Sequence, residues 1–266
     1  MLVRDGRDGL EVFMLQRTLS AAFARGQYVF PGGKVDGADH ADELEPFCGG
    51  LDDRAASDRL GLPSGGLAWI VAAIRECFEE AGVLLARPVD GDGAVRFDDA
   101  ATIARFDAAR HDVHEGARSL VDVCAAEGLV LLADGVHLVD HWITPLGERR
   151  RFDTRFFVAA APDGQSPLHD DKETIASRWV CPDDALGLWR EGELQMFPPT
   201  LASLRFLARV ADVDAATEAA RAVGVPPVVL PRIVLDADER VLGVKVPGED
   251  GYDDVAIPEY VIAHPR

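Results

Sequence analysis

Short apolar runs separated by turn residues occupy the first thirty positions, a pattern that predicts β-strands. "LVRDGRDGLEVFMLQR" holds two apolar runs separated by a turn rich in Asp and Gly, which is typical of a hairpin. "GQYVFPGG" follows as a further short strand. Pro31 is expected to end that strand, and Gly32 and Gly33 permit backbone conformations that other residues avoid.

The clearest helical pattern in the chain is "LAWIVAAIRECFEEAG", which begins at Leu67. At about 100° per residue, one face carries only apolar side chains, namely Ile70, Ile74, Cys77, Phe78 and Ala81. The opposite face carries three acids, Glu76, Glu79 and Glu80. Gly82 stands where a helix C-cap glycine is expected.

The rest of the chain mixes strand and helix patterns. Residues 36–66 are rich in Asp, Gly and Ala and indicate an inserted loop with short helices, while 97–128 show helical spacing for two helices. Strands are predicted at "VLLA", "VHLVDHWITP", "RRFDTRFFVAAAP" and "ETIASRWV", helices at "CPDDALGLWREG" and "PPTLASLRFLARV", and a hairpin after Gly224. Without a strict βαβ order, this mixture favours a layered α/β/α arrangement with a mixed sheet.

Composition narrows the function classes. The chain has 266 residues, 48% of them hydrophobic, which suffices for a sizeable core. Its formal charge of −19 argues against a nucleic-acid partner, which requires a basic surface. An anionic substrate stays open, because a bound metal ion inverts the local field.

Cysteine usage and hydropathy bear on the compartment. Four cysteines lie far apart with no CxxC pair, which fits reduced thiols better than disulfides or a zinc site. We see no signal-peptide pattern and no apolar run of bilayer length. The expectation is a cytoplasmic protein without a membrane partner.

The acidic face of the helix has two interpretations. Three neighbouring carboxylates are either a solvated surface or a cradle for a cation. Glu76, Glu79 and Glu80 are three and four residues apart and share a face. Mg²⁺ prefers oxygen ligands and keeps several waters, so a few carboxylates and substrate phosphates suffice to bind it. Upstream, "PGGK" is a glycine turn that can bring backbone close to a phosphate.

The order of glycine turn, acidic helix, Gly82 and strand resembles the Nudix hydrolases. Their signature is Gly, five residues, Glu, seven residues, then Arg-Glu-apolar-any-Glu-Glu-any-Gly-apolar. The second half is intact here, from Arg75 to Val83. In the first half, Asp39 stands in place of Glu, and 35 residues rather than seven separate it from Arg75.

One branch of that superfamily shares these departures. "VFPGG", the insertion, "RECFEEAGVLLARP", "HWITP", "RRFDTRFF" and "PPT" occur in this order, similar to the branch that contains the mammalian peroxisomal acyl-coenzyme A diphosphatase. The resemblance covers about Val3 to Leu207. It implies an α+β Nudix-type fold in residues 1–210, with insertions at about 40–66 and 97–128. Residues 211–266 would form a C-terminal extension of a helix and a hairpin, of unknown role.

The resemblance also implies roles for the box residues. Mg²⁺ or Mn²⁺ would be held by Glu76, Glu79 and Glu80, with Glu79 and Glu80 catalytic. The glycines Gly32, Gly33 and Gly82 would shape the loop and the helix end. Arg75 would pair with Asp39 and orient the helix, although a phosphate contact is an open alternative and Asp39 is one methylene shorter than Glu.

Several residues outside the box are candidates for catalysis or substrate binding, and for some of them a purely structural interpretation is the alternative. Glu173 is a candidate general base or extra ligand, or a solvated acid. Arg149, Arg150, Arg151 and Arg155 are four arginines in seven residues, and Arg151 and Arg155 are candidates for a substrate 3′-phosphate. The alternative is an exposed turn with one buried ion pair, between Arg155 and either Asp153 or another acid. Arg17 and Arg25 are additional phosphate candidates.

The predicted function is a metal-dependent diphosphatase acting on a small nucleoside-diphosphate derivative. The leading substrate is coenzyme A or acyl-CoA, which would yield 3′,5′-ADP and (acyl) 4′-phosphopantetheine. ADP-ribose, NADH or another dinucleotide is the alternative, and a non-catalytic ligand-binding regulator is a third. A homodimer is left open.

Overall fold

The computed structural model describes residues 1–18, 25–40, 42–145, 148, 151–167, 174–236, 238 and 240–255. The chain forms two compact units. The first comprises Met1–Leu138 and Phe157–Val225, and the second Val139–Phe156 and Pro226–Arg266. The domain boundary at residue 210 stays a prediction.

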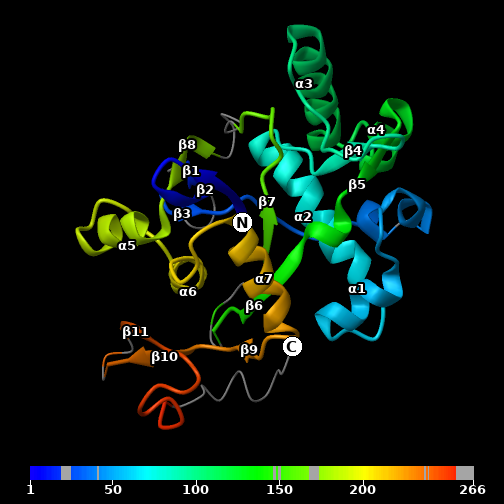
Figure 1. Ribbon diagram of the computed structural model, residues 1–266. Helices are drawn as coiled ribbons and strands as arrows, with labels where there is room; N and C mark the ends of the chain where they lie inside the picture. Colours follow the sequence, from blue (N-terminus) through cyan, green and yellow to red (C-terminus); the bar gives the residue numbers. More distant parts are fainter. Residues whose placement is uncertain are drawn as a thin grey trace. The chain divides into compact units, whose positions relative to one another are not determined.

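The first unit is organised around a mixed β-sheet (Figure 1). Strands β1 (Leu2–Gly6) and β2 (Gly9–Arg17) form the predicted antiparallel hairpin. On β2, β3 (Tyr28–Val29) and β8 (Thr174–Val180) pair antiparallel, whereas β7 (Asp153–Ala160) runs parallel to β1. Both orientations occur, so the predicted α+β fold with a mixed sheet is confirmed.

Strand β2 is buried on both faces. Phe13 and Leu15 belong to the main hydrophobic core, which they share with Ile74 and Phe78 of α2 (Gly66–Ala81). Val12 and Met14 point to the opposite face and are also fully buried. Helix α5 (Pro182–Arg190) contacts β2 and packs against α6 (Pro198–Leu207). Burial of both faces explains why "EVFML" reads as a nearly continuous apolar run.

Helix α2 follows the sequence pattern closely. All five residues of the predicted apolar face are buried, and Gly82 adopts the left-handed conformation at φ 67° as the C-cap. The helix begins at Gly66 because its first N–H groups find acceptors on α1 (Asp53–Leu60). The Asp53 carboxylate accepts from the backbone N–H of Gly65 and Leu67 at 2.9 and 3.0 Å.

The segment before α2 is therefore folded back rather than a continuation of the helix. It contains two 3₁₀ helices, η1 (Gly37–His40) and η2 (Asp42–Phe47), and then α1. Gly66 lies against the backbone of Ser57 so closely that a Cβ would collide with it, and its N–H donates to the Ser57 hydroxyl at 2.9 Å. The predicted excursion with short helices is confirmed.

The second insertion contains α3 (Ala100–His114) and α4 (Leu120–Glu127), as predicted. The strands on either side of this insertion, β4 (Ala86–Pro88) and β5 (Leu129–Leu131), pair antiparallel as a two-stranded sheet. The 3₁₀ helix η3 (Ala133–Gly135) follows β5. The strand predicted at "VLLA" is wrong apart from Ala86. The cause is Gln165, whose side-chain amide takes both the N–H and the C=O of Leu84 in place of a neighbouring strand.

Later elements also match the sequence. Helix α7 (Val213–Val223) closes the first unit, capped by the Asp212 carboxylate. Strand β6 (His137–Ile143) runs into the second unit, where β9 (Val228–Val229) pairs parallel to it. Strands β10 (Arg232–Leu235) and β11 (Val241–Lys245) form the predicted hairpin. In the described part of the chain, no helix has the length and apolarity needed to cross a membrane.

Candidate active site

The glycine turn after β3 lies directly against α2. Gly32, at φ 156°, donates its backbone N–H to Glu80 Oε2 at 2.9 Å. A Cβ on Gly33 would collide with the Glu76 carboxylate. At Gly33 only glycine allows this close approach to α2, whereas at Gly32 a Cβ would meet nothing within 4 Å and it is the positive φ that favours glycine.

Arg75 uses every one of its donors to bind this region together. Its Nε and Nη2 bind the two oxygens of Asp39 at 2.9 and 3.0 Å. Nη1 donates to Glu76 Oε1 at 3.1 Å and Glu79 Oε1 at 2.9 Å, and Nη2 also donates to the Lys34 carbonyl at 2.7 Å. A guanidinium has five N–H groups, and all five are occupied, so none is left for a phosphate.

Asp39 reaches Arg75 because η1 turns it inward. Its side chain is 2% exposed, and it also accepts from the backbone N–H of Asp36 at 2.8 Å. The Arg75–Asp39 contact that the family resemblance implies is therefore present.

The pKa values of Glu76 and Arg75 are both shifted in this cluster. Burial, with the nearby Glu79 and Asp36 carboxylates, raises the pKa of Glu76 to about 7, although Arg75 works in the opposite direction. Burial disfavours the Arg75 cation, but its bonds to Asp39 and Glu79 outweigh this and raise its pKa. The single positive charge of Arg75 is thus shared by the carboxylates of Asp39, Glu76 and Glu79. Of these, Glu76 is the one whose pKa is raised.

The C-terminal end of α2 is held by the second insertion. Arg110 of α3 donates from Nε to the Glu79 carbonyl at 2.8 Å and from Nη2 to the Glu80 carbonyl at 3.0 Å. These are carbonyls that the last helical turn leaves without partners. His114, also of α3, places Nδ1 3.5 Å from Glu79 Oε2. The sequence analysis singled out neither residue, because no local spacing links them to α2.

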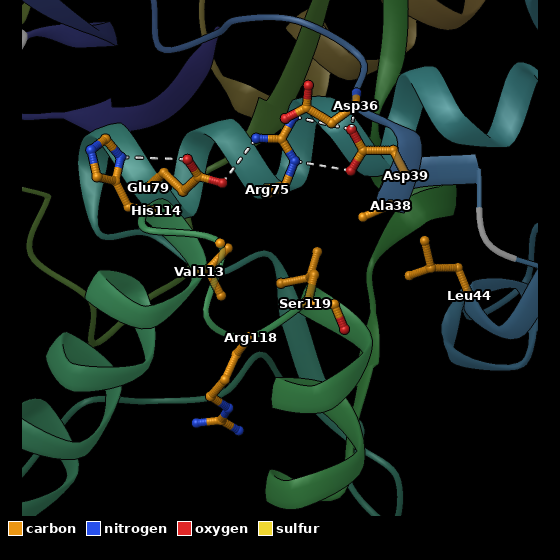
Figure 2. A pocket seen from close by; sticks show the side chains of 12 residues that line it. Asp36, Ala38, Asp39, Leu44, Arg75, Glu79, Val113, His114, Arg118 and Ser119 are labelled. Atoms are coloured by element: carbon orange, nitrogen blue, oxygen red, sulfur yellow. Dashed lines mark hydrogen bonds and ion pairs between the residues drawn. The ribbon is translucent and has the colours of Figure 1, made fainter.

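A cleft of about 220 Å³ opens beside Arg75 and Glu79 (Figure 2). As the figure shows, Arg75 and Glu79 of α2 form one side. Val113 near the end of α3, with Arg118 and Ser119 from the connection between α3 and α4, lies opposite them. Ala38 of η1 and Leu44 of η2, in the first insertion, close one end. Both insertions thus contribute walls to the cleft beside the acidic helix.

Comparison with known proteins identifies the family. Residues 45–207, more than half of the chain, match the family model described as the NUDT19 Nudix domain. The chain belongs to this family. The match contains the second half of the Nudix box, Arg75 to Val83, and begins after Gly33 and Asp39.

Relatives and a solved structure agree with the assignment. The acyl-coenzyme A diphosphatase NUDT19 of Gallus gallus is 31% identical over 223 residues, covering 71% of this chain and 58% of that protein. Its Homo sapiens counterpart is 29% identical, covering 78% and 63%. The crystal structure of a Nudix hydrolase from Alicyclobacillus acidocaldarius matches with a TM-score of 0.65 and 26% identity, over 82% of this chain and 92% of that chain. The chain spans about three fifths of the length of these curated relatives.

The donor chemistry of the Nudix box suits a hard divalent cation. Glu76 and Glu79 converge on the same Arg75 nitrogen, and Glu80 turns toward Gly32. Within the described ranges, no three His, Cys, Asp or Glu side chains stand close enough together to hold one ion. Two carboxylates are nevertheless sufficient protein ligands for Mg²⁺ when waters and substrate phosphates complete the shell. Burial, and then the neighbouring carboxylates, raise the pKa of Glu76, and a bound cation would favour its charged form.

The remaining predicted residues that the structure describes belong to the β2 region and to the second unit. Arg17 ends β2, where its carbonyl accepts from Gly26, next to Arg25. In the second unit, Arg151 Nε donates to the Thr144 carbonyl at 3.2 Å. Arg155, with its side chain 6% exposed, binds Asp153 at 2.9 Å, which is the ion pair foreseen as the alternative to phosphate binding. Glu173, Arg149 and Arg150 lie outside the described residues.

Proposed function

We propose that this protein is a divalent-cation-dependent diphosphatase that cleaves coenzyme A or acyl-CoA. The observation that carries the proposal is the intact second half of the Nudix box, with Glu76 and Glu79 held side by side on Arg75 at 3.1 and 2.9 Å. The relatives from chicken and human are named acyl-coenzyme A diphosphatases, which supports coenzyme A over ADP-ribose or NADH.

In this proposal Glu76, Glu79 and Glu80 hold Mg²⁺ or Mn²⁺. When bound, the ion neutralises the diphosphate and activates a water molecule. The protein's own residues position the metal-binding carboxylates and the substrate. Arg75 holds two of the carboxylates with their oxygens together, and the Gly32–Gly33 backbone gives the substrate phosphates a close approach to them. Glu80 would become available as a ligand if its Oε2 gave up the hydrogen bond from the Gly32 N–H.

The products would be 3′,5′-ADP and (acyl) 4′-phosphopantetheine. Recognition of the 3′-phosphate is assigned to Arg151 rather than Arg155, because Asp153 already compensates the charge of Arg155. Arg17 and Arg25 remain candidates for diphosphate contacts, and Glu173 for the general base. The cytoplasm remains the proposed compartment.

A substrate panel tests the proposal. The purified protein is incubated with coenzyme A, an acyl-CoA, 3′-dephospho-coenzyme A, ADP-ribose and NADH, each with Mg²⁺, with Mn²⁺ and with EDTA, and products are identified by mass. We expect metal-dependent release of 3′,5′-ADP from coenzyme A, and slower cleavage of the dephospho compound. Faster cleavage of ADP-ribose or NADH than of coenzyme A would identify those compounds as the substrates instead. No cleavage of any compound would favour a ligand-binding role.

Arg151→Ala separates recognition from chemistry. A charge-assisted contact to phosphate corresponds to roughly tenfold to hundredfold in relative kcat/KM. The variant should lose that factor on coenzyme A and little on 3′-dephospho-coenzyme A. Equal losses on both would assign Arg151 to the fold, through its bond to Thr144, instead of to the 3′-phosphate.

A further inference from the structure

A second cavity in the first unit is built around three nitrogen-bearing side chains. It measures about 330 Å³, and its polar walls are Arg59 at the end of α1, Asp134 of η3, His137 at the start of β6 and Arg221 of α7. The rest of the lining is apolar or small, namely Gly50, Leu60, Ile70, Val136, Leu138, Ala220 and Gly224.

This cavity is separate from the Nudix box. The two clefts share no lining residue. Ile70, which lines the second cavity, precedes Glu79 by nine residues on α2, which corresponds to about 14 Å along the helix axis. The walls are also held together independently of the box. The C-cap Gly61 of α1 lies so close to Val225, just after α7, that a Cβ would come within 2.8 Å of its Cγ1.

Positive charge at this place is compensated only in part, by Asp134. In the described part of the chain, neither Arg59 nor Arg221 has a carboxylate within salt-bridge distance, although the protein carries a net charge of −19. Arg59 Nη1 donates to the backbone carbonyl of Asp134 at 3.3 Å, which fixes the arginine without neutralising it. Arg221 Nε donates to His137 Nε2 at 3.3 Å.

The hydrogen bond and the pKa of His137 both indicate that its surroundings are positively charged. Its ring is buried, and its Nε2 acts as acceptor toward Arg221, which requires the neutral imidazole. Burial, then Arg221, then Arg59 lower the pKa of His137, and Asp134 opposes them only in part. The two guanidinium groups therefore outweigh the one acid that faces the ring.

From this arrangement we infer that the cavity is a second ligand site, for the phosphate group of a small phosphomonoester. Two guanidinium forks match phosphate oxygens in number and geometry. The volume is at the lower end of small-molecule sites. Leu60, Ile70 and Val136 give an apolar wall for a short organic group, whereas a bare ion would leave that wall without a function. The site is independent of diphosphate cleavage at the Nudix box.

Nuclear magnetic resonance at His137 tests the inference on the whole 266-residue chain. Potassium phosphate is titrated at constant ionic strength against potassium chloride, without divalent cations, and the His137 ring signals are assigned with His137→Gln. We expect a saturable shift and a higher His137 pKa with phosphate. Arg59→Gln and Arg221→Gln should each weaken binding about tenfold. Arg54→Gln, an exposed arginine on α1 outside the cavity, should not change it.

Butyl phosphate tests the organic part of the ligand, and it should bind more tightly than inorganic phosphate. Equal affinity would overturn the assignment of the apolar wall. The site as a whole would be overturned by an unmoved His137 signal, by the same shift in chloride, or by undiminished binding in both arginine variants. Circular dichroism spectra that match the wild type would establish that the variants are folded.

Discussion

Arg75 and Asp39 are joined by two parallel hydrogen bonds, from Nε and Nη2 of the arginine to the two carboxylate oxygens, at 2.9 and 3.0 Å. The two residues are 36 positions apart in sequence and come from different elements, α2 and η1. Both are buried. This pair brings the two halves of the divided Nudix box together across the insertion.

Asp39→Asn should destabilise the protein by about 3–5 kcal/mol, the typical cost of removing one partner of a buried ion pair. Urea unfolding at pH 7 measures it. Asp36→Asn is the matched control, because Asp36 lies 3.7 Å from Arg75 Nη2 and its side chain is 64% exposed. It should cost less than about 1 kcal/mol. Equal losses in the two variants would show that the Arg75–Asp39 pair has no special role.

Gly33→Ala should lower coenzyme A hydrolysis about 100-fold, because a misplacement on the order of 1 Å can cost that much. The added methyl group would collide with the Glu76 carboxylate and push it or the loop aside. Gly37→Ala serves as the control, since a Cβ there meets nothing within 4 Å. The measurement is steady-state kinetics of coenzyme A hydrolysis by both variants. A Gly33→Ala enzyme as active as Gly37→Ala would mean that this close approach is unnecessary.

Sequence alone predicted what is local to α2. Its apolar period placed Ile74 and Phe78 in the core, and Gly82 marked its end, because both signals arise within a few turns of helix. The Arg75–Asp39 pair was available only through the family resemblance, since nothing local connects positions 36 residues apart. Arg110 and His114 were missed for the same reason. Their contacts with α2 depend on how α3 packs, which no periodicity encodes.

Arg110→Ala should destabilise the protein by about 1.5–3 kcal/mol, the range for hydrogen bonds to a charged group. The variant leaves the carbonyls of Glu79 and Glu80 without their donor at the end of α2. Arg105→Ala, on the same helix, removes a more exposed ion pair with Glu127 and should cost less than about 1 kcal/mol. The comparison is made by urea unfolding. If Arg105→Ala were the more damaging change, the capping role of Arg110 would have to be abandoned.

His137 makes stability depend on pH. Its pKa is lowered in the folded protein by burial and the two arginines, so the unfolded chain takes up a proton first as pH falls below about 6.5. The free energy of unfolding should therefore decrease with falling pH in that range, and His137→Gln should flatten the slope. The exposed His111→Gln provides the control. Identical slopes for all three proteins would contradict the prediction.

The central claim is that the carboxylates of α2 hold a cation that serves diphosphate cleavage. Glu79→Gln tests it most directly, because a neutral amide is a poorer ligand for a hard cation and the side chain keeps its size. Coenzyme A hydrolysis is measured over a series of Mg²⁺ concentrations, with the exposed Glu43→Gln as control. We predict a loss on the order of 100-fold or more at saturating Mg²⁺, with an unchanged circular dichroism spectrum. A near-normal rate at saturating Mg²⁺ would contradict the account.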